Sequence, residues 1–183
     1  AIPLLILVAV VVTFGSLIPD FFGAASVTNL ARRWGEFGLL VIALMIVMVA
    51  GGIDLSVGSI FALGNIVALA MLNVAGWPVW AVVAATLGCG AAVGMVNGLL
   101  VGYLRLRAFL TTLVTLIIVR AVVDMLLLRY SVPIAASFVD SDLWYFFGEG
   151  FVLGIPFSVL VAGIVALAAH LVLSRTRAGW HVL

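Results

Sequence analysis

The residues of this chain that could take part in catalysis are few and scattered. The two histidines, His170 and His181, lack the spacing of a metal-binding pair. Cys89 is the single cysteine, which excludes an internal disulfide and a cysteine-based metal cluster. No G-x-x-x-x-G-K-[ST] phosphate loop is present. We therefore expect no catalytic site, no metal and no cofactor on this chain, and we expect any nucleotide to bind another polypeptide.

Arg120 and Asp124 are four residues apart in an apolar stretch, so they share one face of a helix and can form an ion pair. Charged side chains within a membrane are costly and normally face the protein interior or a wet cavity. We favour a structural ion pair, because each residue supplies the other's partner. A proton relay is the alternative interpretation.

The stretch AGGIDLSVGS, residues 50–59, interrupts the apolar sequence with glycines and polar residues. Gly51 and Gly52 predict the end of a helix, because glycine adopts backbone conformations that other residues avoid. Asp54 and Ser56 suit the start of the next helix, where side-chain oxygens cap free N–H groups. We favour a turn between two helices, with Gly58 in the second. The alternative is a broken helix that lines a polar cavity.

A third feature is the segment GCGAAVGMVNG, in which Gly90, Gly94 and Gly98 recur at four-residue spacing. This spacing predicts a smooth helix face against which another helix packs closely. Asn65 and Asn97 can hydrogen-bond between helices or line a path, and we favour the packing role.

The composition indicates the elements that position these residues. The chain is 67% hydrophobic and 8% charged, whereas a soluble domain is about one-quarter charged, so we expect a membrane protein. The net charge of +1 argues against a nucleic-acid partner. A membrane-spanning helix needs about 20 residues, and roughly six stretches qualify or nearly do. They are residues 2–18, 36–50, 55–72, 79–104, 109–128 and 157–174. The predicted fold class is all-α, a polytopic transmembrane helical bundle, since the alternation of a membrane barrel is absent from these stretches.

The arginines predict the orientation, because positive residues are enriched on the cytoplasmic side of membrane proteins. Alternation of the spans then puts the N-terminus inside and the acidic 129–156 segment outside. The predicted second span, residues 36–50, is only about 22 Å long, so the break after it is expected near or within the membrane boundary. The difference in the number of arginines between the two sides is small. Four fall inside, Arg105, Arg107, Arg175 and Arg177, and three fall outside, Arg32, Arg33 and Arg129. An interfacial helix before residue 36 would ease this conflict.

Four segments together resemble one family. GGIDLSVGSIFAL, residues 51–63, resembles the signature of bacterial ABC-type sugar permeases of the ribose, xylose, arabinose and autoinducer-2 group. NGLLVGYLRLRAFLTTLVT (97–115) is similar to the next segment of that family, and Arg120 matches an arginine that follows. GIP (154–156) and RTRAGW (175–180) resemble a span entry and the start of the cytoplasmic coupling region. The chain departs from the family at Ala108, where proline is usual, and at Val114 and Ala121, where glycine is common.

The resemblance implies a permease of about ten spans, of which residues 1–183 form a single transmembrane domain with about six. We therefore expect the chain to be part of a longer protein. The resemblance also implies a substrate path near the break, whose expected residues are Gly51, Gly52, Asp54, Ser56, Gly58, Phe61 and Asn65. The expected side for coupling to an ATPase begins at Arg175, Thr176, Arg177 and Gly179.

The function that the resemblance implies is the pore subunit of an ATP-driven, binding-protein-dependent importer of a monosaccharide, in the bacterial inner membrane. The expected partners are cytoplasmic ABC ATPase subunits that bind ATP and Mg²⁺, a periplasmic sugar-binding protein and a second permease subunit. Three alternatives stay open. They are an ion-coupled secondary transporter that uses Arg120 and Asp124, an ABC permease for a non-sugar cargo, and a membrane scaffold.

Overall fold

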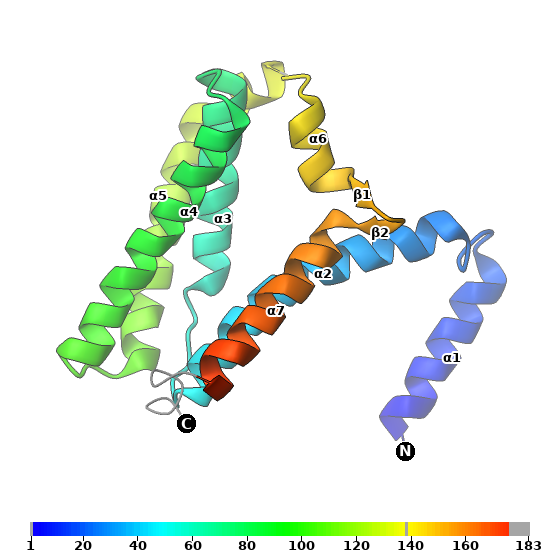
Figure 1. Cartoon of the computed structure of the whole chain (residues 1–183), viewed down its shortest axis with the longest axis horizontal. Coiled ribbons are helices and arrows are strands. Elements are labelled where there is room, and N and C mark those ends of the chain that lie inside the picture. Colours follow the sequence, from blue (N-terminus) through cyan, green and yellow to red (C-terminus); the bar gives the residue numbers. More distant parts are fainter. Residues whose placement is uncertain (1, 138, 176–183) are drawn as a thin grey trace.

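Helices carry most of the residues that the computed structural model describes, which are 2–137 and 139–175. Three of them, α3 (Val57–Leu69), α4 (Val79–Gly98) and α5 (Ala108–Ala136), lie together as a bundle. A second group is the pair of α2 (Ala24–Val49) and α7 (Phe157–Arg175). Figure 1 shows that α1 (Ile2–Leu17) stands apart, and it buries none of its residues. The segment between α2 and α3 joins the pair to the bundle.

The bundle has two small apolar cores. Leu63 and Ile66 of α3 pack with Val119 and Val123 of α5 in the first. The second brings the end of α3 and the start of α4 together around Val82, which is fully buried. Both α3 and α4 continue as π-helical turns, Ala70–Val74 and Leu99–Tyr103. Because lipid is as apolar as these side chains, close van der Waals packing holds such helices together, not removal of apolar surface from water.

The α2/α7 pair is held by a close approach of two backbones. Gly35 is the buried residue of α2, and a Cβ built on it would lie 2.6 Å from the backbone carbon of Ser158 and the backbone nitrogen of Val159. The Ser158 hydroxyl donates a hydrogen bond of 3.1 Å to the carbonyl oxygen of Arg32. Only glycine therefore allows α7 to lie this close to α2.

The polar segment 129–156 is more ordered in secondary structure than its sequence predicts. The predicted end of the fifth span at residue 128 was wrong, because α5 continues through the apolar residues around Pro133 to Ala136. A short helix, α6 (Asp142–Glu149), follows. Ser141 caps its start, because the Ser141 hydroxyl accepts a hydrogen bond from the backbone N–H of Trp144. Strands β1 (Phe151–Val152) and β2 (Ile155–Pro156) then form a two-residue hairpin ladder before α7.

The all-α membrane prediction is confirmed. Four helical segments are long and apolar enough to cross a membrane, Val57–Val74, Val79–Tyr103, Ala108–Ala136 and Phe157–Arg175, and they correspond to the last four predicted spans. The first predicted span is an apolar helix of 16 residues. The predicted start of the second at residue 36 was wrong, because α2 begins at Ala24 and runs through Arg32, Arg33 and Glu36. With 26 residues, α2 is about 39 Å long, so a short second span no longer argues for a break within the membrane.

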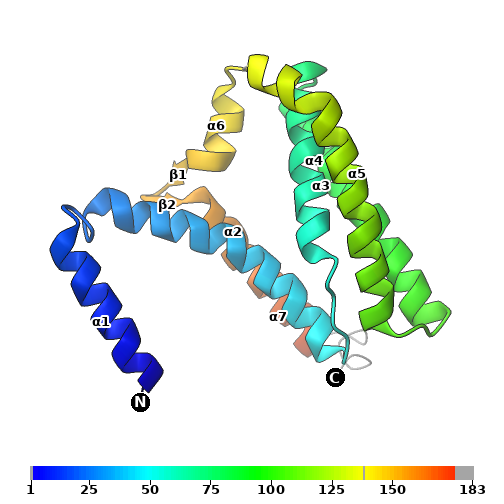
Figure 2. The same ribbon diagram turned by 180° about the vertical axis from the view of Figure 1, so that it is seen from behind.

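The turn between α4 and α5 and the end of α7, which were both predicted on the cytoplasmic side, lie at one end of the molecule (Figures 1 and 2). The segment between α2 and α3 lies at the same end. α6 lies toward the opposite end of the gap between the bundle and the α2/α7 pair in both views. This arrangement matches the predicted alternation of the spans, while the orientation in a membrane stays a prediction.

Candidate functional site

The end of α2 is built as the glycines predict. The backbone N–H of Gly51 donates to the carbonyl of Met48, and that of Gly52 donates to the carbonyl of Val47, both at 3.0 Å. This pair of bonds is the Schellman motif, which satisfies the last carbonyls of a helix. Gly51 has a φ of +77°, a conformation that side chains disfavour. The helix therefore stops at a defined residue, and the chain turns toward α3.

A chain of hydrogen bonds connects the segment between α2 and α3, residues 50–56, which we call the break, to two other helices. The Asp54 carboxylate accepts from the backbone N–H of Ser56 at 2.7 Å and from its hydroxyl at 2.6 Å. The Ser56 hydroxyl in turn accepts from the side-chain amide of Asn97 on α4 at 3.0 Å. The amide oxygen of Asn97 accepts from the Thr115 hydroxyl on α5 at 2.6 Å. All donors thus point in one direction, toward the negative charge of Asp54, so each bond polarises the next.

Thr112 of α5 makes a second connection to the break. Its hydroxyl accepts a 3.1 Å hydrogen bond from the backbone N–H of Leu55 and lies 3.1 Å from the carbonyl oxygen of Ile53. Thr112 is buried, as are Ser56 and Asn97. We call Asp54, Ser56, Asn97, Thr112 and Thr115 the latch, because their side chains fix the break to α4 and α5.

The predicted capping role of Ser56 was wrong. Ser56 is the residue before α3, but its hydroxyl caps no backbone N–H of that helix. Asp54 instead accepts the backbone N–H of Ser56, two residues ahead, as in an Asx turn. The favoured packing role of Asn97 agrees with its bonds to Ser56 and Thr115.

A cavity of about 380 Å³ adjoins the break. It is lined by Gly52, Asp54, Asn97 and two of the spaced glycines, Gly94 and Gly98, among others. A Cβ at Gly94 or Gly98 would meet nothing within 4 Å, whereas one at Gly90 would lie 3.9 Å from Ile60 on α3. Within the described residues, only Gly90 of the predicted glycine face therefore contacts another helix, and the packing role of Gly94 and Gly98 stays a prediction.

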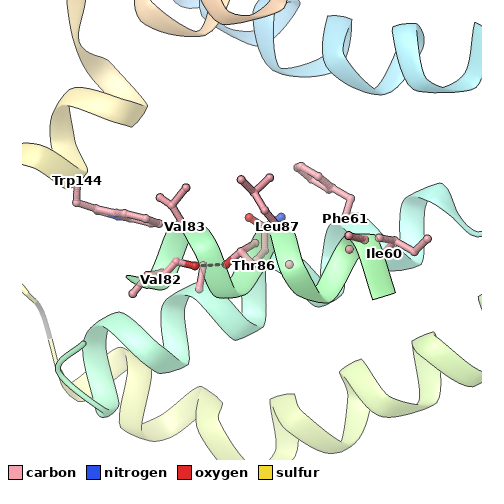
Figure 3. Close-up of a pocket in the computed structure, with 12 residues that line it drawn as sticks. Ile60, Phe61, Val82, Val83, Thr86, Leu87 and Trp144 are labelled. Atoms are coloured by element: carbon pink, nitrogen blue, oxygen red, sulfur yellow. Dashed lines mark hydrogen bonds between the residues drawn. The ribbon is translucent and has the colours of Figure 1, made fainter. Parts of the chain in front are cut away.

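A second cavity, of about 490 Å³, lies between α3 and α4 and is drawn in Figure 3. Both of the predicted path residues on α3, Phe61 and Asn65, line it. Figure 3 shows Trp144 reaching toward it from α6, and Phe61 and Leu87 on the side that faces α2. The hydroxyl of Thr86, which also lines the cavity, donates to the carbonyl of Val82 at 2.8 Å. The walls are mainly apolar, with a few polar groups, as is usual for small-molecule sites.

Arg120 and Asp124 form the predicted ion pair, with 3.4 Å between the Arg120 Nε and an Asp124 carboxylate oxygen. Their side chains are 62% and 57% exposed, and neither residue lines the cavities described above. The pair thus lies on an outer face of α5, away from the break.

Arg32 is one of the three arginines that were predicted on the outer side, and its side chain contacts α6 and β1. Its guanidinium donates a 2.8 Å hydrogen bond to the carbonyl of Glu149 and lies over the ring of Phe151, 4.8 Å from the ring centroid. These contacts attach α6 and the hairpin to α2, so Arg32 has a structural role at this end. Of the predicted coupling residues, Arg175 ends α7, and Thr176, Arg177 and Gly179 lie outside the described residues.

Three residues that the sequence reading did not single out belong to this site. Thr112 and Thr115 tie α5 to the break, and Trp144 borders the cavity of Figure 3. The two threonines could have been predicted from the sequence, because hydroxyl residues three apart in an apolar helix share one face. Trp144 could not, because its position depends on how α6 folds back.

The family of this chain follows from comparison with known proteins. A family model described as "Branched-chain amino acid transport system / permease component" matches residues 26–183. The chain belongs to this permease family. With its apolar helices, it is a multi-pass membrane protein.

Several relatives are named for sugar transport. The chain is 36% identical over 182 residues to the ribose import permease protein RbsC of Escherichia coli (strain K12), covering 99% of this chain and 55% of the relative. It is 30% identical over 186 residues to the fructose import permease protein FrcC of Rhizobium meliloti, covering 100% and 52%. It is 31% identical over 154 residues to the galactofuranose transporter permease protein YtfT of Escherichia coli (strain K12), covering 84% and 43%. The chain thus spans about half the length of the curated relatives it matches, and no solved structure matches it. The resemblance to sugar permeases is confirmed.

Proposed function

We propose that this chain forms part of the pore subunit of an ATP-driven importer of a monosaccharide or a similar small polar sugar. The observation that carries the proposal is the similarity over 99% of the chain to a ribose import permease. The complete transporter would contain a second permease subunit, cytoplasmic ABC ATPase subunits and a periplasmic sugar-binding protein, in the bacterial inner membrane. ATP and Mg²⁺ belong on the ATPase, so this chain binds no cofactor.

The two cavities support a path for a small solute along α4. Several residues between 82 and 91 of α4 line the cavity of Figure 3, and Gly94, Asn97 and Gly98 of the same helix line the cavity at the break. The first offers Asn65, Thr86 and the rings of Phe61 and Trp144, and the second offers Asp54 and Asn97. Amide, hydroxyl and aromatic groups suit a neutral sugar, and both volumes fall in the range of about 300–1,000 Å³ typical of small-molecule sites.

In this proposal the break is the hinge of the pore subunit. Gly51 and Gly52 provide the turn, while Asp54 and Ser56 hold its far side to α4 and α5 through the latch. Movement of the α2/α7 pair relative to the bundle would then change access to both cavities, as in hinge motions of other proteins. The force for this movement would come from the ATPase and would act through the coupling side at Arg175, Thr176, Arg177 and Gly179.

The proposal is tested with the complete transporter, reconstituted in vesicles with its ATPase and binding protein. We expect uptake of a neutral monosaccharide that requires ATP and stops when the ATPase is catalytically inactive. Uptake driven by a proton gradient without ATP would instead support the ion-coupled alternative. The exposed position of Arg120 and Asp124, outside both cavities, argues against that alternative.

A permease for an amino acid is the second candidate, because the matching family model is described by branched-chain amino acid transport. The same vesicles distinguish the two cargoes when ribose, fructose and leucine are supplied separately with the cognate binding protein. ATP-dependent uptake of leucine without uptake of any sugar would replace the sugar proposal.

A further inference from the structure

A third cavity, of about 540 Å³, lies between α2 and the end of α6. Its polar lining residues are Asn29, Arg32, Arg33, Glu36 and Glu149, and its rings are those of Phe37 and Phe61. Unlike the cavity of Figure 3, it has walls that are largely polar. We call it the entry cavity, since the end of the molecule where α6 lies is the one predicted to face the outside.

Several charged groups of the entry cavity have no partner within the described part of the chain. Arg33 and Glu36 are one helical turn apart on α2, yet neither makes an ion pair or a hydrogen bond there. Arg32, in contrast, is committed to the carbonyl of Glu149 and the ring of Phe151 and so builds the wall between α2 and α6. Charged residues on helices of a membrane protein are costly, and a functional role is the default interpretation when they lack partners.

The chemistry of these groups indicates the class of ligand. Arg33 supplies only donors, Glu36 only acceptors, and the amide of Asn29 both. The two arginines are balanced by two glutamates, Glu36 and Glu149, so the lining has no excess charge to attract an anion. A hydroxyl group both donates and accepts, so a neutral solute with several hydroxyls can use all of these groups. The rings of Phe37 and Phe61 supply apolar surface for its C–H groups.

Phe61 connects the entry cavity with the cavity of Figure 3, because its side chain lines both. It is 48% exposed, so it is not fixed within the core of the bundle. We propose that the entry cavity is the first binding site for the sugar in this chain, where Arg33, Glu36 and Asn29 hold its hydroxyls before it passes Phe61. This inference rests on the proposed function and adds to it a specific site of reception.

A cysteine reporter in the complete transporter tests the site. Leu40 lines the entry cavity, so Leu40→Cys in a Cys89→Ala background is labelled with a maleimide from the outer side. Ribose, fructose and leucine are the probes. We expect the transported sugar to slow labelling at least fivefold, and Glu36→Ala and Arg33→Gln each to remove most of this protection. Asp140→Asn is the matched control, because Asp140 is an exposed carboxylate outside the cavity.

The outcomes separate this inference from the proposed function. Protection by sugar that is lost in Glu36→Ala and Arg33→Gln but kept in Asp140→Asn supports the inference. ATP-dependent sugar uptake without protection, or with protection that survives both substitutions, overturns the inference and leaves the proposed function standing. Protection by leucine together with uptake of leucine alone overturns both.

Discussion

The bundle α3–α5 and the pair α2/α7 are held together by different interactions. In the bundle, side chains of α4, α5 and the segment before α3 form the latch, and two apolar cores add to the packing. In the pair, contact depends on the missing side chain of Gly35, against which the backbone of α7 lies directly. Both solutions suit a membrane, where apolar burial gives little driving force and close packing or hydrogen bonds must supply the stability.

The difference indicates which part can move. The break belongs to both regions: its first half ends α2, and its second half is fixed to the bundle by Asp54 and Ser56. A network of directed hydrogen bonds has one good geometry, and this network fixes the second half of the break to the bundle but does not include Gly51 or Gly52. We therefore expect the bundle to move as one body and the pair to move against it at Gly51 and Gly52.

Gly35→Ala is expected to give the largest effect and tests the pair. The added Cβ would lie 2.6 Å from two backbone atoms of α7, so the helices must separate, and we expect destabilisation of about 3 kcal/mol. Gly38→Ala is the control, because its Cβ would meet Ala162 at an ordinary 3.7 Å. Thermal unfolding of the complete permease in detergent measures both. Equal Tm values for the two variants would contradict the close contact.

Asn97→Leu tests the bundle. It removes the donor to Ser56 and the acceptor for Thr115, and buried groups left without partners should lower the free energy of unfolding by about 2 kcal/mol. Asn65→Leu is the matched control, since Asn65 has no hydrogen bond within the described residues and lines a cavity. If Asn65→Leu destabilises the protein as much as Asn97→Leu, the latch is not what holds the bundle.

Asp54→Ala tests whether the latch is one unit. Loss of the carboxylate leaves the N–H and hydroxyl of Ser56 without their acceptor, and we expect destabilisation of about 1.5 kcal/mol. Asp54→Asn keeps one carbonyl oxygen and should have a smaller effect. The double variant with Asn97→Leu should lose less than the sum of the single effects, because both act on one network. Strict additivity, measured by denaturant or thermal unfolding, would show two independent contacts.

Gly51→Ala tests the boundary between the two regions. Its positive φ disfavours a side chain, so we expect a loss of about 1 kcal/mol. Gly58→Ala is the control: it lies inside α3 with open space around its Cβ position, where alanine favours a helix. A stability for Gly51→Ala at or above that of Gly58→Ala would mean that the turn does not need this conformation.

The smallest effect is expected at Arg120 and Asp124, which belong to neither the latch nor the cavities. Removing both charges with Arg120→Gln and Asp124→Asn should leave stability little changed, because the two charges are removed together and neither is left unpaired in the membrane. Uptake by the complete transporter should stay within about twofold of wild type. Loss of uptake in this double variant would revive the ion-relay interpretation.

The sequence predicted local structure well where one residue type has one strong preference. Gly51 and Gly52 located the end of α2, and the long apolar runs located α3, α4 and α7 nearly to the residue. The prediction failed where a helix continues through charged residues. Arg32 and Arg33 looked like part of a connection between spans, and Glu36 looked like the first residue of a span. In the structure α2 passes through all three, and α6 and α7 provide partners for Arg32.

The candidate site was only partly predictable for a related reason. Asp54 and Ser56 were singled out because polar residues beside a helix break are conspicuous, and Phe61 was singled out through the family resemblance. Their partners Thr112, Thr115 and Trp144 come from distant segments. The sequence does not show which hydroxyl groups in an apolar helix have a polar partner on another helix. The packing of the helices decides this, as it does for Thr112 and Thr115.

Labelling at Phe61 during transport tests the central claim most directly, which is that the sugar passes Phe61 on its way to the cavities along α4. Phe61→Cys in a Cys89→Ala background is treated with a bulky maleimide in vesicles that import sugar. Leu128→Cys, on the 87% exposed outer position of α5, is the control. We predict that modification at Phe61→Cys reduces uptake at least tenfold and is slowed by the sugar, whereas modification at Leu128→Cys changes neither. Full modification of Phe61→Cys with normal sugar uptake would contradict the path.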